Sequence, residues 1–301
     1  MYLERFTLPV AEEQRMIEER MEENGGNYGY IDNPYPCGLF GPKGLTSLRF
    51  DRITILYGGN GSGKSTLLNL IASKLSLNRI APYNSGELFD TYTDACTYSL
   101  GEDDEGFPLR IPNGSRIITS DDIFDYMLAA RTNNEEIAAT LERGKEAYGE
   151  LKFGDTLPFR SMEDYESLRL QVQARKKRLS RRQFLRRNIG EETRLRSNGE
   201  TALQYFEGKL KNDTLYCLDE PENSLSSGHQ LKLAALLTEL SRYCGCQLIL
   251  ATHSPFLLAL DGARIYDLDA APVAVKNWWE LESIRTYYRF FSEHSQLFQT
   301  K

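Results

Sequence analysis

The chain has 301 residues, of which 36 are basic and 43 acidic, so its formal net charge is −7. Hydrophobic residues make up 41% of the chain, which excludes a disordered protein and a small scaffold held together by disulfides. A chain of this length buries a substantial core in one large domain or two. The acidic balance argues against a general nucleic-acid coat, although it leaves room for a local basic patch.

No apolar stretch approaches the roughly 18 to 20 residues that a membrane-spanning helix needs. Glu4 and Arg5 occupy the place where a signal peptide would carry its apolar segment, so we expect a cytoplasmic protein. The five cysteines form no Cys-x-x-Cys pair and the chain has three histidines, which disfavours a zinc site and favours reduced, buried thiols.

The N-terminal part opens with an alternating, strand-like segment at 2–8, followed by a loop rich in proline and glycine at 30–44. The apolar run 53–57 then stops at four residues dominated by glycine, and a second apolar run begins at 67. This pattern predicts a buried strand, a glycine loop and a helix. Further on, a small antiparallel sheet beside the main one is predicted by three short segments: Thr97–Leu100, Pro108–Ile111 and Arg116–Thr119.

Charged, helix-forming sequence predicts a helical insertion at 120–196, broken into pieces by Gly144, Gly149, Gly154 and Pro158. The remaining residues, 1–119 and 197–301, form the predicted core. The elements expected after the insertion are a helix at 200–211, a strand at 214–218, a helix at 228–243, strands at 247–251 and 264–268, and a C-terminal helix. Such alternation indicates an α/β fold with a mostly parallel sheet covered by helices on both faces.

Residues 58–65 match the phosphate-loop pattern G-x-x-x-x-G-K-[ST] in full. Glycines let the backbone curl so that amide groups point at phosphate oxygens, and the following helix adds the positive end of its dipole. Lys64 would hold the β and γ phosphates, and the Ser65 hydroxyl would be a ligand of Mg²⁺. The candidate nucleotide-binding residues are Gly58, Gly59, Asn60, Gly61, Ser62, Gly63, Lys64, Ser65 and Thr66.

The predicted strand that ends at 218 is followed by two acids, Asp219 and Glu220. Asp219 would face the phosphate loop on the neighbouring strand and hold Mg²⁺, and Glu220 would polarise the attacking water. A third polar residue, His253, ends another apolar strand. A lone histidine is more often structural, but ligands of such folds bind at this edge of the sheet, so His253 is a candidate hydrogen-bond donor to the γ phosphate.

The order of these motifs resembles ABC-type ATPase heads of the SMC and RecF kind, and most of all the stand-alone bacterial ATPases often labelled AAA family ATPase. The resemblance covers nearly the whole chain and is weakest in the insertion. It implies a P-loop NTPase that binds ATP with Mg²⁺ and hydrolyses it. Besides the phosphate loop, the motifs are Ser-Asn-Gly-Glu at 197–200, Leu-Asp-Glu-Pro at 218–221, Asn-Ser-Leu-Ser at 223–226 and Thr-His-Ser-Pro at 252–255.

By this resemblance, Walker A is 58–65, Walker B is 215–219, Glu220 is the catalytic glutamate and His253 is the switch histidine. The D-loop is 223–226. The segment 197–200 corresponds to the signature motif, so Ser197 and Gly199 would touch the γ phosphate held by an opposite subunit, and the family implies a homodimer that forms on ATP binding.

Two features depart from the family pattern. The signature lacks the usual second glycine and glutamine, and read by itself it is a helix N-cap. No glutamine lies between Thr66 and Leu170, where the family has its Q-loop residue, and Ser120 or Asp121 takes that place.

Nine basic and no acidic residues lie between Ser167 and Gly190, in a stretch from Arg169 to Arg187. The stretch could neutralise phosphates of DNA or RNA, or it could be a solvated helix paired with an acidic surface. Near the C-terminus, helical spacing indicates core packing rather than a binding stripe for Trp278, Leu281, Ile284, Tyr288 and Phe291.

Three functions stay open on the sequence alone. The first is an ATPase that works as a nucleotide-driven, two-subunit switch in DNA repair or phage defence. The second is a slow or non-hydrolysing, nucleotide-gated module that regulates a partner protein such as a nuclease or toxin, and the two departures motivate it. The third, an ABC transporter ATPase subunit, is disfavoured by the short signature and the missing glutamine.

Overall fold

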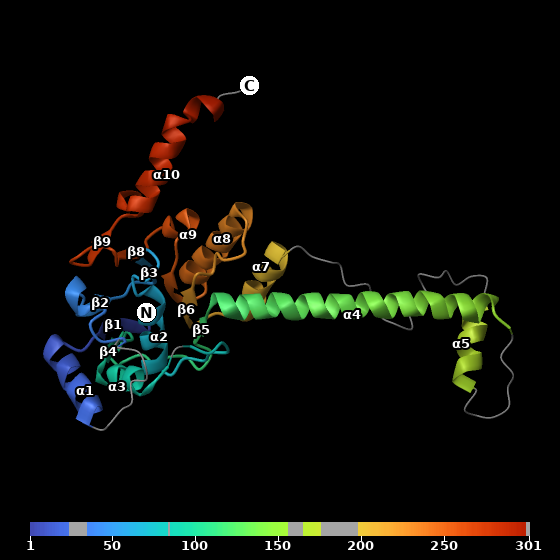
Figure 1. The fold of residues 1–301 in the computed structure, drawn as a ribbon, viewed down its shortest axis with the longest axis horizontal. Coiled ribbons are helices and arrows are strands. Elements are labelled where there is room, and N and C mark those ends of the chain that lie inside the picture. The colour runs from blue at the N-terminus through green and yellow to red at the C-terminus, as the bar shows by residue number, and fades with distance from the viewer. Residues whose placement is uncertain (24–34, 84, 156–164, 176–197, 299–301) are drawn as a thin grey trace. The chain divides into compact units, whose positions relative to one another are not determined.

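The computed structural model describes residues 1–23, 35–83, 85–155, 165–175 and 198–298. The chain divides into two compact units (Figure 1). One unit combines Met1–Phe124 with Ala202–Lys301, and the other is Asp125–Thr201. The predicted insertion at 120–196 differs from this division by five residues at each end, and as a domain assignment it stays a prediction.

The main sheet of the larger unit has, among the described residues, six strands in the order β5-β6-β7-β3-β8-β9. All neighbouring strands are parallel except β8 and β9. β3 and β7 are buried at every position, as expected of parallel strands covered on both faces. The strands are β3 (Ile53–Tyr57), β5 (Arg116–Ile118), β6 (Leu215–Asp219), β7 (Gln247–Ala251), β8 (Arg264–Asp267) and β9 (Ala274–Lys276).

A second, antiparallel sheet has the strand order β2-β1-β4, where β1 is Leu3–Thr7, β2 is Ser47–Arg49 and β4 is Thr97–Leu100. The predicted small sheet therefore exists and contains the predicted strand Thr97–Leu100, but the other two predicted segments do not belong to it. The segment Pro108–Ile111 contributes only an isolated bridge between Glu102 and Pro108, and β5 joins the main sheet parallel to β6. Short apolar segments carry no sequence signal for the sheet that they join, since that choice depends on distant strands.

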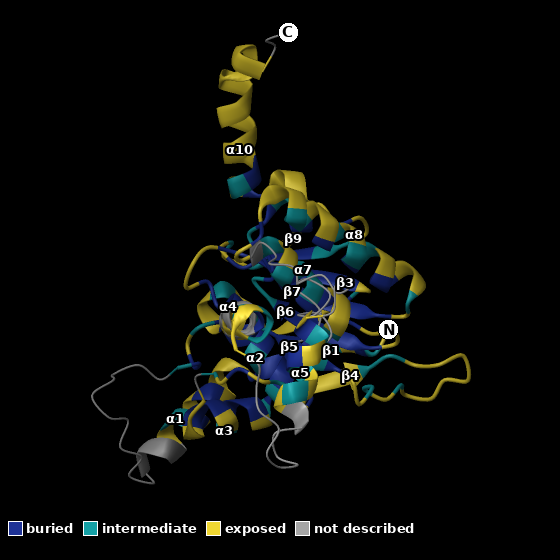
Figure 2. Ribbon diagram, turned by 90° about the vertical axis from the view of Figure 1, so that its right-hand side faces the viewer, coloured by how far each residue is buried: buried dark blue, intermediate teal, exposed yellow. Residues whose placement is uncertain are grey.

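Helix α2 begins at Lys64 and lies against β5, β6 and β7. Strands and helix share a continuous apolar core in which Phe6, Leu56, Leu70 and Ile249 are fully buried, and Figure 2 shows the buried residues concentrated along the sheet. The helices of the larger unit are α1 (Ala11–Glu23), α2 (Lys64–Lys74), α3 (Glu87–Ala95), α8 (Ser227–Tyr243), α9 (Pro255–Leu258) and α10 (Glu282–Glu293). Short 3-10 turns are η1 (Gly41–Lys43), η3 (Trp278–Glu280) and η4 (Ser295–Phe298).

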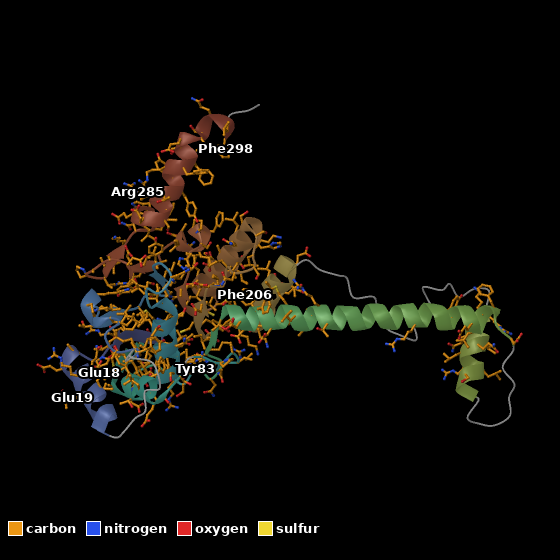
Figure 3. All side chains as sticks on the ribbon, viewed as in Figure 1. Glu18, Glu19, Tyr83, Phe206, Arg285 and Phe298 are labelled. Carbon is orange, nitrogen blue, oxygen red and sulfur yellow. The ribbon has the colours of Figure 1, made fainter. Side chains whose placement is uncertain are left out.

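Among the residues that the structure describes, the C-terminal helix α10 packs on the core only at its start. Leu281 and Ile284 are buried, whereas Tyr288 is 69% exposed and Phe291 51% exposed. Figure 2 shows the helix exposed beyond its first turn, and Figure 3 shows side chains standing out from it between the labelled Arg285 and Phe298. The expectation that this aromatic series is core packing is therefore confirmed for Leu281 and Ile284, and it is wrong for Trp278, Tyr288 and Phe291. Helical spacing identifies an apolar face but not how much of its length finds a partner.

Two hydrogen bonds connect the start of α10 to the strand that enters the phosphate loop. The hydroxyl of Tyr57, the last residue of β3, donates to Ser283 Oγ over 2.9 Å. The Ser283 backbone N–H donates to the same tyrosine oxygen over 3.2 Å. The first turn of α10 is thus hydrogen-bonded to Tyr57, the residue that precedes Gly58.

Helix α4 spans Ser120–Phe153, and α5 of the smaller unit spans Tyr165–Arg175. The predicted breaks at Gly144 and Gly149 are wrong, because α4 continues through both glycines and ends immediately before Gly154. A single glycine in a helix costs about 1 kcal/mol relative to alanine, which a long run of strong helix formers offsets. In the smaller unit, Tyr148 and Ala174 form a small buried cluster with Leu151 and Leu170 packed against it.

Helix α7 (Asn198–Lys209) contains residues of both units, and its buried Phe206 belongs to the larger one. Within the described ranges, no helix is both long enough and apolar enough to span a bilayer. All five cysteines are free, four of them are buried, and burial raises the pKa of Cys217 to about 12.

Candidate nucleotide-binding site

The phosphate loop connects β3 to α2 through a backbone that needs its glycines. Gly61 and Gly63 have φ angles of 77° and 102°, which residues with a side chain rarely adopt. A Cβ on Gly63 would also come within 2.9 Å of the Phe40 ring, which is fully buried. The loop therefore has the curled shape that the sequence pattern predicts.

Lys64 is only 4% exposed, and its ammonium group lies inside the loop. Nζ donates to the carbonyl oxygen of Gly58 over 2.7 Å and to that of Gly59 over 3.0 Å. Burial lowers the pKa of Lys64 below its ordinary value, and the negative charges of Glu220 and Asp219 oppose this shift. Phosphate oxygens are the ligands that such a buried cation, framed by a glycine loop, would bind.

Ser65 and Asp219 meet across the sheet edge. Ser65 Oγ donates to Asp219 Oδ1 over 3.0 Å. The expectation that Asp219 lies on the strand next to the loop is wrong, since β7 separates β6 from β3. The contact forms because α2, which carries Ser65 in its first turn, lies against β6.

The Ser65 hydroxyl and the Asp219 carboxylate are hard oxygen ligands of the kind that Mg²⁺ takes together with substrate phosphates. Burial raises the pKa of Asp219 to about 6, although the hydrogen bond from Ser65 acts in the opposite direction. The described residues hold no group of three or more His, Cys, Asp or Glu suited to a metal ion. A site built from one hydroxyl, one carboxylate and phosphate oxygens is compatible with that finding, so the residues fit Mg²⁺.

Glu220 lies between Asn223 and His253, so its carboxylate is held on two sides. Asn223 Nδ2 donates to Glu220 Oε2 over 3.0 Å. His253 Nε2 lies 3.4 Å from Glu220 Oε1, which is close enough for an ion pair with a protonated ring but lacks the geometry of a hydrogen bond. Glu220 also has a φ of 47°, a left-handed conformation that is costly for a residue with a side chain and often occurs at functional sites.

Two residues that the sequence analysis did not single out hold the loop from outside. Asp269 Oδ2, just after β8, accepts a hydrogen bond from the Gly59 backbone N–H over 2.7 Å. Lys43 Nζ donates to the carbonyl oxygens of Ser62 over 2.8 Å and of Leu268 over 2.9 Å. Neither residue belongs to a motif, and each acts on atoms that are far away in the chain, so no local pattern could have identified them.

The structure brings Lys64, Ser65, Asp219, Glu220 and His253 to one edge of the sheet. It does not test the proposed signature motif. Ser197 lies outside the described residues, and Gly199 belongs to the smaller unit. Of the basic stretch, Arg169 and Arg175 are described and the other seven residues are not. Roles for all of these residues stay predictions.

Two family models match the chain. One, described as "ABC transporter", matches residues 46–223. The other, described as "AAA domain, putative AbiEii toxin, Type IV TA system", matches residues 195–259. A search of curated proteins gave no match.

Several solved structures are similar at low identity. The SMC head domain from Thermotoga maritima has 16% identity and a TM-score of 0.39, with 92% of this chain and 99% of that chain covered. The Smc head domain with an extended coiled coil bound to the C-terminal domain of ScpA, from Pyrococcus furiosus, has 14% identity, coverage of 81% and 95%, and a TM-score of 0.38. The ATP-binding cassette MJ0796, a dimer bound to ADP and Pi, has 15% identity, coverage of 77% and 88%, and a TM-score of 0.35.

The predicted α/β fold with a mostly parallel sheet is confirmed by the observed strand order. The ABC transporter model spans more than half of the 301 residues and includes both the phosphate loop and the acidic pair. The chain therefore belongs to the ABC family of P-loop ATPases.

Proposed function

We propose that the chain is a Mg²⁺-dependent ATPase that works as a nucleotide-driven switch between one and two subunits. The observation that carries the proposal is the convergence of a buried loop lysine, the Ser65–Asp219 pair and the Glu220–His253 pair at one sheet edge. These groups match the parts of a phosphoryl-transfer site: a phosphate cradle, metal ligands, a base and a hydrogen-bond donor.

In this proposal each residue has a distinct task. Lys64 binds the β and γ phosphates, and Ser65 and Asp219 would hold Mg²⁺, whose chemistry is to neutralise charge on the transferring phosphoryl group. Glu220 orients the attacking water and accepts its proton. His253, whose Nε2 has no hydrogen-bond partner among the described residues, donates to the γ phosphate.

The dimer completes the site. Ser197 and Gly199 of a second copy would close over the γ phosphate, so that ATP holds two copies together and hydrolysis releases them. The proposal makes ATP-dependent assembly the most direct test, because it does not depend on knowing a partner.

Glu220→Gln is expected to accumulate an ATP-bound dimer, since it binds nucleotide but cannot activate water, whereas Lys64→Ala is expected to stay monomeric. Size-exclusion chromatography with light scattering, with and without ATP and Mg²⁺, measures both. Glu239→Gln and Lys232→Ala on the exposed face of α8 are matched controls that should behave as the wild type. If Glu220→Gln and Lys64→Ala both elute as the wild type in ATP, the sandwich mechanism is wrong.

A second candidate is a nucleotide-gated module that hydrolyses slowly and regulates a partner protein, with a role in DNA repair or phage defence left open. Two observations favour this second candidate. Residues 195–259 match the family model whose description names a putative toxin of a type IV toxin–antitoxin system, and the Q-loop glutamine is missing. A steady-state phosphate-release assay, with and without duplex DNA, separates the two candidates, because brisk turnover contradicts the regulatory module.

A further inference from the structure

Glu222, two residues beyond Glu220, is a buried carboxylate that the proposed mechanism does not use. It is 8% exposed and lies in the segment between β6 and α8. A single oxygen, Oε1, accepts three hydrogen bonds, from Thr252 Oγ1 over 2.7 Å, the His253 backbone N–H over 2.6 Å and the Ser254 backbone N–H over 3.0 Å. One side chain therefore fixes three consecutive residues that follow β7.

The two backbone bonds fix the peptide groups on both sides of the His253 Cα. The ring that extends from this Cα places Nε2 3.4 Å from Glu220 Oε1. Thr252 is fixed a second time, since its Oγ1 also accepts from the Ser254 backbone N–H over 3.0 Å. The direction of the His253 ring therefore depends on an acceptor supplied by a different loop.

The Glu220 side of this contact is fixed by the same loop. The Asn223 backbone N–H donates to the Glu220 carbonyl oxygen over 3.1 Å, and the Glu220 backbone N–H donates to the Ala251 carbonyl oxygen over 2.9 Å. Residues 220–223 and 251–254 thus form one hydrogen-bonded unit, with Glu222 at its centre and the Glu220–His253 contact at its surface.

The other oxygen of this carboxylate, Oε2, is buried and has no hydrogen-bond donor among the described residues. A buried acceptor without a donor is unfavourable for folding, and such atoms in natural proteins usually have a reason other than stability. An apolar side chain would avoid this cost but could not accept the three hydrogen bonds. A glutamate at this position therefore holds His253 in place at a cost to the stability of the folded chain.

We propose that Glu222 is a positioning residue that holds His253 opposite Glu220, and so sets the geometry of the γ-phosphate side of the site. The catalytic part of this role rests on the proposed ATPase function. The placement of His253 does not, and the experiment separates the two.

Glu222→Ala removes the acceptor, Glu222→Asp withdraws the carboxylate by one methylene, and Glu222→Gln keeps an oxygen acceptor. Phosphate release is expected to fall on the order of 10²-fold in Glu222→Ala, the size of effect expected when a reacting group is misplaced by about 1 Å. ATP affinity, which depends mainly on the phosphate loop, is expected to stay within about twofold. Glu222→Gln should recover most of the lost turnover, and Glu222→Asp should recover less than Glu222→Gln.

Two further measurements distinguish positioning from a general loss of structure. Adding His253→Ala to Glu222→Ala should cause little further loss of turnover, because both changes remove the same interaction. The chain has three histidines, so the His253 ring signal is identified in an NMR spectrum by its absence in His253→Ala. This signal should move in Glu222→Ala and Glu222→Asp and return toward its original position in Glu222→Gln, while Glu239→Ala leaves it unchanged.

The NMR measurement needs no hydrolysis. If the wild type releases no phosphate but the ring signal follows this order, the positioning of His253 stands and the ATPase proposal fails. If the wild type is active and Glu222→Asp matches it in both turnover and ring signal, the inference is overturned. The aspartate variant keeps the test decisive even if Glu222→Ala does not fold.

Discussion

Burial is the largest cause of the pKa shifts of two charged residues at the phosphate loop, Lys64 and Asp219. Lys64 is buried and Asp219 is half-buried, and burial shifts the pKa of each in the direction that favours the neutral form. Each charge partly stabilises the other, and a phosphate or a metal ion brought by the nucleotide would change this balance. Burial of these two charged groups is therefore a local cost to stability, as expected of a site shaped for a charged ligand.

This cost predicts a dependence of stability on pH. In the unfolded chain the Asp219 carboxyl loses its proton near pH 3.8, whereas in the folded chain it keeps the proton until about pH 6. Between these values the folded state binds more protons, so the free energy of unfolding falls as the pH rises. Asp219→Asn is expected to be more stable than the wild type above pH 6, by up to about 3 kcal/mol for a shift of about two pKa units.

Urea unfolding at a series of pH values, in EDTA and without nucleotide, measures this difference. It should shrink as the pH falls from 6 toward 4. Asp104→Asn, at an exposed position, serves as the control and should show no such trend. An advantage of Asp219→Asn that is independent of pH would mean that burial does not hold this carboxyl in its protonated form.

The sequence predicts residues of the site best where chemistry demands a fixed spacing. The glycines, Lys64 and Ser65 follow one another in a loop, and Asp219 and Glu220 directly follow an apolar strand. Asp269 and Glu222 were missed because each acts through a hydrogen bond to a backbone group in another loop. An acid that accepts from a distant amide has the same local sequence as any exposed acid.

At the scale of elements, α10 has two different halves. Its first turn is buried against the core and is bonded to Tyr57, while the following turns expose large aromatic rings. Those rings contact neighbouring rings, as in the pair Phe290–Phe291 within α10 and the pair of Phe291 with Phe298 of η4. Within the described part of the chain, the helix is thus stabilised by contacts with the core only at its beginning.

Two substitutions in α10 should therefore differ strongly in their effect on stability. Ile284→Ala leaves a cavity in the core and is expected to lower the free energy of unfolding by about 2 to 4 kcal/mol. Tyr288→Ala removes a side chain that is 69% exposed and is expected to change it by less than about 0.5 kcal/mol. Urea unfolding measures both. Comparable losses would mean that the second half of the helix is also packed in solution.

Elements were predictable where periodicity was strong. The strand predicted at 247–251 is β7, and the helix predicted at 228–243 differs from α8 by one residue at its start. The sheet joined by Arg116–Ile118 was not predictable, since three residues do not encode their neighbours. Helix α4 was not predicted to continue through Gly144 and Gly149, because each glycine was taken as a helix break. In a helix as long as Ser120–Phe153, the many surrounding residues offset the cost of two glycines.

At the scale of the whole molecule, the net charge of −7 is the sum of unlike parts. The stretch from Arg169 to Arg187 carries nine positive charges, and the remaining 27 basic and 43 acidic side chains give −16. Such separation of sign is the electrostatic pattern of a protein that binds a polyanion through one segment. Most of this stretch lies outside the described residues, and the separation of charge along the sequence is what supports a binding role for it.

This separation predicts salt-dependent binding to nucleic acid. The test variant replaces four arginines by glutamine: Arg181, Arg182, Arg186 and Arg187. Each phosphate neutralised on duplex DNA contributes about 0.9 to the slope of log affinity against log salt, so the variant should reduce the size of this slope by up to about 3.6. Fluorescence anisotropy with duplex DNA, single strands and RNA across a salt series measures the slope. Replacing exposed Lys232 by glutamine is the control. Absence of binding at low salt would favour pairing of this stretch with an acidic surface instead.

Trp278 and Trp279 are the two tryptophans of the chain, and both lie in η3 at the root of α10. They are 36% and 52% exposed, and their rings pack edge to face. Intrinsic tryptophan emission therefore comes from this short turn and not from the core of the sheet. Since Ser283, a few residues further along, is hydrogen-bonded to Tyr57 just before the phosphate loop, the emission spectrum is a native optical probe of a region connected to that loop.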